Sequence, residues 1–198
     1  MKNKVQHGNM ALNIDISKAF ETIRWDFIFT ILKMHGFLEK LLGLVFSILK
    51  NASLSILVNG SPKGFFQCTR GFRQGDPLSG LLFSLFEDYL SVCLHDLVNT
   101  GIYQRMRAGN TSFSPTHLFY ADDILLFCKV DKKKISCIKS IFSHYEEVAG
   151  RVISWGKSFV VFGEKVRILK QNRVALRLGV KKGKLPFNYL GFHCFGEG

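Results

Sequence analysis

The stretch THLFYADDILLF, residues 116–127, places two adjacent aspartates between two runs of apolar and aromatic residues. This pattern predicts two short β-strands with Asp122 and Asp123 at the turn between them. Two neighbouring carboxylates in a hydrophobic setting repel each other and lose hydration, so a cation is needed to neutralise them. The alternative is an exposed hairpin turn, a position for which aspartate is also suited.

A third candidate carboxylate is Asp15, which ends the apolar stretch ALNID (11–15). Residues 10–17 alternate and predict a strand that ends just before a helix. If this strand pairs beside the hairpin of Asp122 and Asp123, all three carboxylates converge at one sheet edge. Mg²⁺ prefers oxygen ligands, and two divalent ions about 3.5–4 Å apart clamp the reacting oxygens in phosphoryl-transfer enzymes. Taken alone, Asp15 would more simply cap the helix.

The length, composition and net charge indicate which classes of protein this chain fits. The chain has 198 residues, of which 47% are hydrophobic, enough for one domain with a real core. Its net charge of +12 favours a polyanionic partner, most often nucleic acid, although a solvated basic surface is the alternative. The five cysteines include no C-x-x-C pair, which favours free thiols in a reducing compartment over disulfides or a zinc site. Charged residues interrupt the longest apolar region, 27–49, so no membrane span is expected.

The remaining periodicity predicts a single α+β unit without internal repeats or linkers. Helices are expected from Phe20 to Gly36, over 38–50, from Pro77 to before Gly101, over 132–149 and over about 164–177. Asp76 should cap the third of these helices, with Pro77 at its first position. Strands or hairpins are expected over 53–69, 158–163 and 185–195, and residues 103–115 should form a loop or an irregular hairpin.

Three sequence blocks, in order, resemble the reverse-transcriptase domain of non-LTR retrotransposons, the LINE-type elements, especially those of plant genomes. ALNIDISKAFETIRWDFI (11–28) is similar to the family's first catalytic block. RGFRQGDPLSGLLFSL (70–85) resembles its RQGDPLSP block, and FYADD (119–123) matches its F[FY]ADD block. The segments SILVNG, GRVISWGKS and LPFNYLG resemble lesser blocks, so that the similarity extends over nearly the whole chain.

The resemblance implies a polymerase palm, with an antiparallel sheet backed by helices, that acts as an RNA-directed DNA polymerase. Asp15 and Asp122 would be metal ligands, Asp123 would complete the acidic cluster, and the backbone carbonyl of Ile16 would face a metal. The cofactors would be two Mg²⁺ ions, with Mn²⁺ as a substitute. The partners would be an RNA template, a DNA primer and deoxynucleoside triphosphates, without a membrane or a disulfide partner.

The resemblance also assigns nucleotide-binding roles. Phe20 would lie under the sugar and exclude a ribose 2′-hydroxyl, although plain helix core is an alternative for it. Arg73, Gln74 and Gly75 would form the loop beneath the incoming nucleotide and the template base, or else an ordinary loop before a helix. Lys157 would approach the triphosphate and protonate the leaving pyrophosphate, with a surface lysine as the alternative.

The chain departs from the family pattern at several positions. Glu21 stands where the family usually has Asp, and Gly80 replaces the usual Pro. In the block 150–158, Arg151 and Ser154 occupy the positions of a usual Gln and Asn, and these changes affect the assignment of Lys157 more than that of the aspartates.

Domain organisation follows from the extent of the resemblance. Residues 1–198 are expected to form one palm domain, truncated on its N-terminal fingers side, with about 183–198 as the start of the palm–thumb connection. We therefore expect weak or no polymerase activity from this chain alone, and a catalytically inactive, nucleic-acid-binding remnant is the alternative function. The expected location is intracellular, nuclear or cytoplasmic, because no signal peptide or transmembrane segment is evident.

Overall fold

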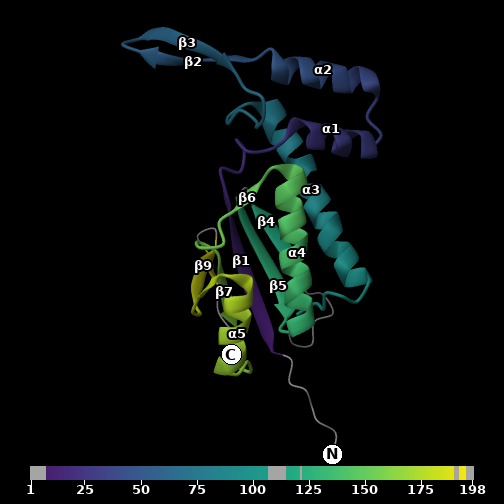
Figure 1. The fold of residues 1–198 in the computed structure, drawn as a ribbon, viewed down its shortest axis with the longest axis vertical. Helices are drawn as coiled ribbons and strands as arrows, with labels where there is room; N and C mark the ends of the chain where they lie inside the picture. The colour runs from purple at the N-terminus through teal and green to yellow at the C-terminus, as the bar shows by residue number, and fades with distance from the viewer. Residues whose placement is uncertain (1–7, 107–114, 121, 190–191, 195–198) are drawn as a thin grey trace, which may run out of the picture.

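The computed structural model describes residues 8–106, 115–120, 122–189 and 192–194, and it has an α+β fold built on one central sheet (Figure 1). The strand order is β4-β5-β1-β7-β8, and a short strand, β6, also pairs with β1. Their bounds are β1 Asn9–Ser17, β4 His117–Tyr120, β5 Asp123–Lys129, β6 Val152–Ile153, β7 Phe159–Phe162 and β8 Lys181–Lys182. The pairs are antiparallel except β7 with β8, which is parallel.

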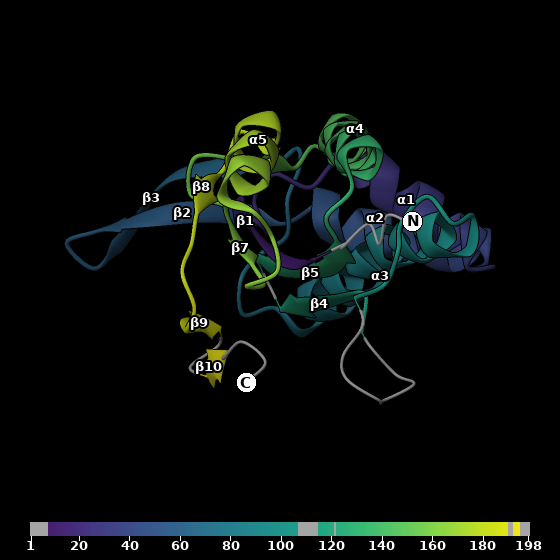
Figure 2. The same ribbon diagram turned by 90° about the horizontal axis from the view of Figure 1, so that it is seen from below.

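Helices cover one face of this sheet. Figure 2 shows α4 and α5 side by side over the strands, while α3 runs along the side of β4. The helix bounds are α1 Trp25–Met34, α2 Glu39–Lys50, α3 Pro77–Asn99, α4 Lys132–Ala149 and α5 Ile168–Leu178. Two hairpins stand apart from the sheet, β2 Ser53–Val58 with β3 Ser61–Gln67 and β9 Phe187–Tyr189 with β10 Phe192–Cys194. Within the described residues, no helix is both long and apolar enough to cross a membrane.

The alternation of β1 decides which face of the sheet becomes the core. Its residues Met10, Leu12, Ile14 and Ile16 have at most 2% of their surface exposed and pack into the main apolar cluster. Side chains of a strand alternate between its two faces, so Asp15 projects to the opposite face. The covering helices are therefore on the far side of the sheet from this carboxylate.

The helix predicted from Phe20 to Gly36 begins later than expected, at Trp25. Residues 18–22 form a turn instead, and Lys18 has a φ of 50°. The carbonyls of Phe20 and Ile23 accept hydrogen bonds from the amides of Phe72 and Gly71. Since these bonds reach a segment distant in the sequence, tertiary contacts override the apolar periodicity there. The last helix also begins later than expected, at Ile168.

Other expected elements are confirmed. Asp76 caps α3 by accepting a hydrogen bond from the amide of Leu78, with Pro77 at the first position of the helix. The β2–β3 hairpin turns at Asn59 and Gly60, which have φ values of 51° and 77°. Residues 107–114, within the loop expected over 103–115, lie outside the described residues.

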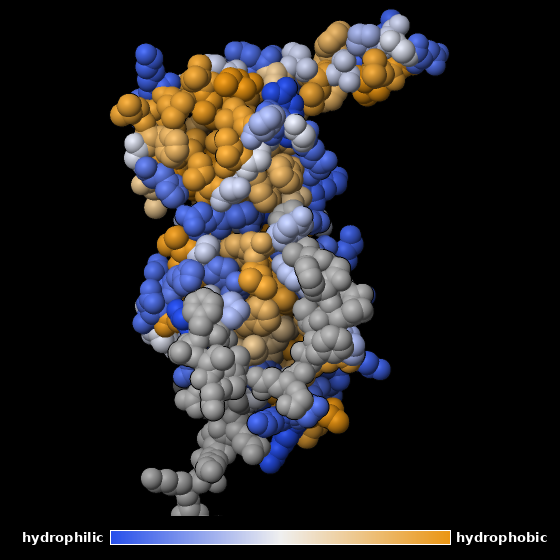
Figure 3. Space-filling model, turned by 180° about the vertical axis from the view of Figure 1, so that it is seen from behind, coloured by the Kyte–Doolittle hydropathy of each residue, from blue (hydrophilic) through white to orange (hydrophobic). Residues whose placement is uncertain are grey.

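Exposed apolar side chains gather at the end of the molecule formed by α2 and the β2–β3 hairpin (Figure 3). Those on α2 are Leu41, Leu44, Phe46 and Ile48, and those on the hairpin are Ile56, Leu57, Val58, Phe65 and Phe66. Exposed apolar side chains gathered in this way are typical of a surface that contacts another molecule or another segment of chain.

Gly71 should be intolerant of a side chain, whereas Gly80 should not. Gly71 has a φ of 79°, and a Cβ there would lie 2.5 Å from the carbonyl oxygen of Glu21. Gly71→Ala should therefore lower the free energy of unfolding by more than about 1 kcal/mol. Gly80→Ala, inside α3 with open space around it, should raise it by about 0.5–1 kcal/mol. Chemical denaturation measures both, and equal effects of the two substitutions would contradict the expectation.

Candidate active site

The β1–β5 pairing places two of the predicted carboxylates opposite each other. Asp15 is the register partner of Asp123, at the end of a ladder that begins with Asn9 opposite Lys129. Side chains of directly opposed residues in antiparallel strands lie on the same face, with Cβ atoms about 4.5–5.5 Å apart. The sequence-based expectation that the first strand pairs beside the hairpin is therefore correct.

Asp122 occupies the turn between β4 and β5, next to the opposed pair. Its carbonyl accepts a hydrogen bond from the amide of Ile16, at 3.0 Å, which ties the turn to the end of β1. The Asp122 side chain is exposed, whereas those of Asp15 and Asp123 are half-buried. The Ile16 side chain is buried, so only its backbone could take part in a site.

The three carboxylates influence one another electrostatically. Partial burial raises the pKa of the Asp123 carboxyl above its ordinary value, and repulsion from Asp122 and then Asp15 raises it further. Within the described residues, however, no group of three or more His, Cys, Asp or Glu side chains is arranged to hold a metal ion. The aspartates thus converge without forming a closed cage.

The turn that carries Lys157 is attached directly to Asp15. The Asp15 amide donates to Ser158 Oγ at 3.2 Å, and the Ser154 amide donates to the Asp15 carbonyl at 2.8 Å. Lys157 lies between these two serines with an exposed side chain. Ser154 and Ser158 were not singled out as site residues by sequence reasoning; the only signal for Ser158 was its place in the block 150–158.

The predicted nucleotide-binding residues other than Lys157 form a second group around the loop before α3. Phe20 stacks on Phe83, with ring centroids 4.2 Å apart and planes 6° apart. Gln74 Nε2 donates to Glu21 Oε1 at 3.0 Å, and Arg73 forms an ion pair with Asp76 at 3.1 Å.

Phe20 and the loop are joined through the backbone, since the Phe72 amide donates to the Phe20 carbonyl at 2.8 Å. Gly75 adopts a φ of 81°, a conformation that favours glycine. The structure therefore brings Phe20 and residues 73–75 together.

A buried ion pair supports this second group from beneath. The Arg151 guanidinium is fully buried and donates to the Glu87 carboxylate of α3 and to the Ala19 carbonyl, one residue before Phe20. It also lies 5.0 Å from the ring centroids of Phe83 and Phe86. Burial raises the pKa of the Glu87 carboxyl to about 7, against the opposing attraction of the guanidinium.

Sequence reasoning noted Arg151 only as a departure from the family block. Glu87 carried a signal that was not used, because it lies four residues after Phe83 on the buried face of α3. A charged residue on such a face calls for a buried partner.

A helix-backed sheet with opposed aspartates at the end of two central strands has the architecture of a polymerase palm. Residues 1–194 match the reverse transcriptase (RNA-dependent DNA polymerase) family, and the chain therefore belongs to that family. Polymerases of this family use divalent metal ions.

Similar sequences include Pol proteins of mobile elements. A Pol polyprotein of the R2 retrotransposable element from Popillia japonica is 29% identical over 119 residues, which are 58% of this chain and 18% of that protein. A protein of transposon TX1 from Xenopus laevis is 28% identical over 150 residues, 74% of this chain and 11% of that protein. An uncharacterized mitochondrial protein from Arabidopsis thaliana is 40% identical over 70 residues, 35% of this chain and 57% of that protein. The chain thus spans less than two thirds of each of these relatives.

Solved structures share the fold. Apo telomerase from Candida tropicalis, truncated from its C-terminal domain, superposes with a TM-score of 0.61 at 16% identity, covering 82% of this chain and 32% of that one. Telomerase from the same organism, in complex with a fragment of telomeric RNA, gives a TM-score of 0.59 at 14% identity, covering 82% and 27%. These matches establish the palm fold for this chain.

Neutralising Asp123 should stabilise the protein in the absence of metal. The raised pKa means that the folded protein binds a proton at Asp123 more tightly than the unfolded chain does. The stability that this proton provides is present below about pH 3.8, the ordinary pKa, and is lost as pH rises through the pKa of the folded state. Asp123→Asn removes this loss and should raise the free energy of unfolding at pH 7 by up to about 1 kcal/mol, a modest gain because the carboxyl is only half-buried and solvent screens its charge.

Thermal unfolding in EDTA between pH 3 and 7 measures this difference. Asp96→Asn, an exposed change on α3, is the matched control and should leave stability within about 0.5 kcal/mol. An Asp123→Asn protein that is less stable than wild type at pH 7 would show that the carboxylate is held favourably, against our expectation.

Breaking the buried ion pair on one side only should be costly. Arg151→Met leaves the Glu87 carboxyl buried without its counter-charge, and the free energy of unfolding should fall by about 3–5 kcal/mol. Adding Glu87→Leu removes the second charge and should recover a large part of that loss. Denaturation of the wild type, both single variants and the double variant gives the coupling energy. A double variant that is no more stable than Arg151→Met would mean that the pair contributes little beyond the separate contacts of Arg151.

Proposed function

We propose that this chain is a single reverse-transcriptase palm domain that extends a primer 3′-hydroxyl by RNA-directed nucleotidyl transfer with two divalent metal ions. The observation that carries this proposal is the pairing of Asp15 with Asp123 beside the turn of Asp122, in a chain that belongs to the reverse transcriptase family. Residues after about 183 would begin the connection to a thumb.

The donor set fits Mg²⁺. Carboxylate oxygens are the ligands this ion prefers, and Mg²⁺ is commonly held by one or two carboxylates together with waters and substrate phosphates. An open pair of aspartates is therefore sufficient, and a closed cage is not required. Burial and then repulsion from Asp122 and Asp15 raise the pKa of Asp123, and a divalent cation that neutralises the carboxylates would relieve this repulsion. Asp15 and Asp122 would be ligands, Asp123 would complete the cluster, and the Ile16 carbonyl would face a metal; Mn²⁺ could substitute.

When bound, the two ions would lower the pKa of the primer hydroxyl and stabilise the leaving pyrophosphate. The residues of this chain position the reactants. Phe20, held by its stack on Phe83, would lie under the sugar and exclude a 2′-hydroxyl. Gly75 would let the backbone approach the nucleotide closely, and Lys157, exposed on the turn tied to Asp15, would donate a proton to the pyrophosphate.

Arg73 and Gln74 would act in the loop beneath the incoming nucleotide and template base. Their present partners, Asp76 and Glu21, hold this loop in place next to Phe20. The other partners would be an RNA template, a DNA primer and deoxynucleoside triphosphates. The net charge of +12 supports contacts with the phosphates of these strands.

A catalytically inactive remnant that binds nucleic acid is the second candidate. The observation that favours it is the net charge of +12, because contacts with phosphates require no catalytic carboxylates. Its net charge would then serve binding alone.

Primer extension on an RNA template, with Mg²⁺ and then with Mn²⁺, tests the proposed function. The wild-type chain alone should give weak extension at most, and Asp122→Asn should reduce any extension at least about 100-fold because a metal ligand is lost. Asp96→Asn, which also removes one exposed carboxylate, should extend like the wild type.

Circular dichroism and a melting curve establish that each variant is folded. No extension by folded wild type under either metal would refute the polymerase function and support the remnant. Equal extension by wild type and Asp122→Asn would refute the assignment of the carboxylates.

A further inference from the structure

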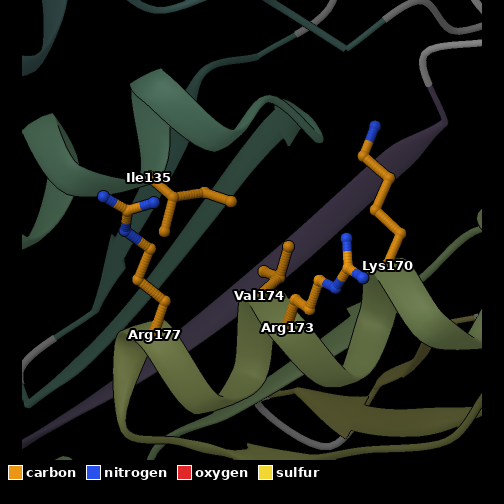
Figure 4. A pocket seen from close by; sticks show the side chains of 5 residues that line it. All are labelled: Ile135, Lys170, Arg173, Val174 and Arg177. Carbon is orange, nitrogen blue, oxygen red and sulfur yellow. The ribbon is translucent and has the colours of Figure 1, made fainter.

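A basic pocket lies between α4 and α5, away from the carboxylates. It has a volume of about 250 Å³ and is lined by Ile135 of α4 and by Lys170, Arg173, Val174 and Arg177 of α5. Figure 4 shows the three basic side chains rising from the same helix around this pocket. We call it the α4–α5 pocket.

The two arginines of this pocket lack counter-charges in the described part of the chain. No described Asp or Glu lines the pocket, and the Arg173 and Arg177 side chains make no ion pair or hydrogen bond there with another described residue. Lys170 Nζ donates to the Val130 carbonyl at 2.8 Å, which holds its charge at one end of the pocket. Residues three and four apart on a helix are neighbours, and like charges at these spacings destabilise it, so a bound anion would relieve the repulsion.

The pocket is separate from the candidate active site. The Val130 amide donates to the Gly8 carbonyl, so Lys170 lies at the beginning of β1, whereas Asp15 lies near its end. At about 3.3 Å per residue of strand, Lys170 and Asp15 are roughly 20 Å apart. Arg177 lies nearer to the Asp15 end of β1, because the chain continues from α5 to Lys181, whose amide donates to the Ser158 carbonyl. The pocket and Asp15 are also on different faces of the sheet, because α4 and α5 cover the face opposite Asp15 (Figure 2).

We infer that the α4–α5 pocket binds the phosphate backbone of an RNA strand outside the primer–template duplex at the carboxylates. Lys170, Arg173 and Arg177 form a line of positive charge about 10 Å long, at 1.5 Å per helical residue. This length is greater than one phosphate group and matches about three phosphates along a strand. Arginine donates in a planar fork that suits phosphate oxygens. That the strand is the template RNA rests on the proposed function; the binding of phosphate does not.

Fluorescence anisotropy with a labelled single-stranded RNA tests this inference. Arg173→Gln with Arg177→Gln removes two charges while keeping good helix formers in α5. Affinity should fall on the order of 10-fold, and the slope of log K against log salt should become shallower by roughly 1–1.5. Arg173→Lys with Arg177→Lys keeps the charge and should retain most of the affinity.

Lys40→Gln with Lys50→Gln is the matched control. It removes the same net charge from exposed positions on α2, at the other end of the molecule (Figure 1), and should change affinity less than twofold. Melting curves establish that every variant is folded. Equal weakening by the arginine pair and by this control would overturn the inference, since net charge alone would then explain binding.

Inorganic phosphate at constant ionic strength separates a strand from a free anion. Stabilisation of the wild type by phosphate alone, with RNA affinity unchanged in the arginine variant, would overturn the inference in favour of a small-anion site. A wild type that binds no RNA would overturn it as well. A wild type that binds RNA through these arginines but does not extend a primer would leave the inference standing and refute only the proposed polymerase function.

Discussion

The antiparallel pairing of β1 with β5 is the constraint on which both the core and the candidate site depend. Its register places Ile14 beside Ile124 and Leu12 beside Leu126 on the face under the helices. The same register sets Asp15 opposite Asp123 on the other face. A slip of one residue would exchange the faces, exposing the apolar residues and burying the carboxylates. Burial of the apolar face therefore holds two like charges opposite each other.

At this end of the sheet, repulsion between the carboxylates opposes the packing of the apolar face. Two opposed carboxylates and a third in the adjoining turn repel one another at the end of the ladder. Burial, and then this repulsion, raise the pKa of the Asp123 carboxyl. Hydrogen bonds between the turn of residues 154–158 and the Asp15 backbone anchor the strand at this point. Unfavourable repulsion between charges is common at functional sites, because a preformed cluster of charge can bind a cation without first reorganising.

A buried ion pair positions the second group of site residues, Phe20 and residues 73–75. Arg151 and Glu87 are buried among aromatic rings, and the guanidinium also holds the carbonyl of Ala19. This contact joins α3, the segment that follows α4 and the turn that carries Phe20. A buried ion pair contributes little net stability compared with apolar packing, but its geometry restricts how these three segments meet. The position of Phe20 is thereby coupled to residues far from it in the sequence.

The sequence by itself determined the α+β class, the capped α3, the hairpin that bears Asp122 and Asp123, and the identity of the acidic residues, because periodicity, capping and turn chemistry act over a few residues. It did not determine the turn at 18–22, where apolar spacing predicted helix, because backbone bonds to Gly71 and Phe72 decided that segment. Nor did it reveal the Arg151–Glu87 pair, the serines that hold Asp15, or the basic α4–α5 pocket. These features join segments distant in the chain, and only the packed tertiary structure decides which of them meet.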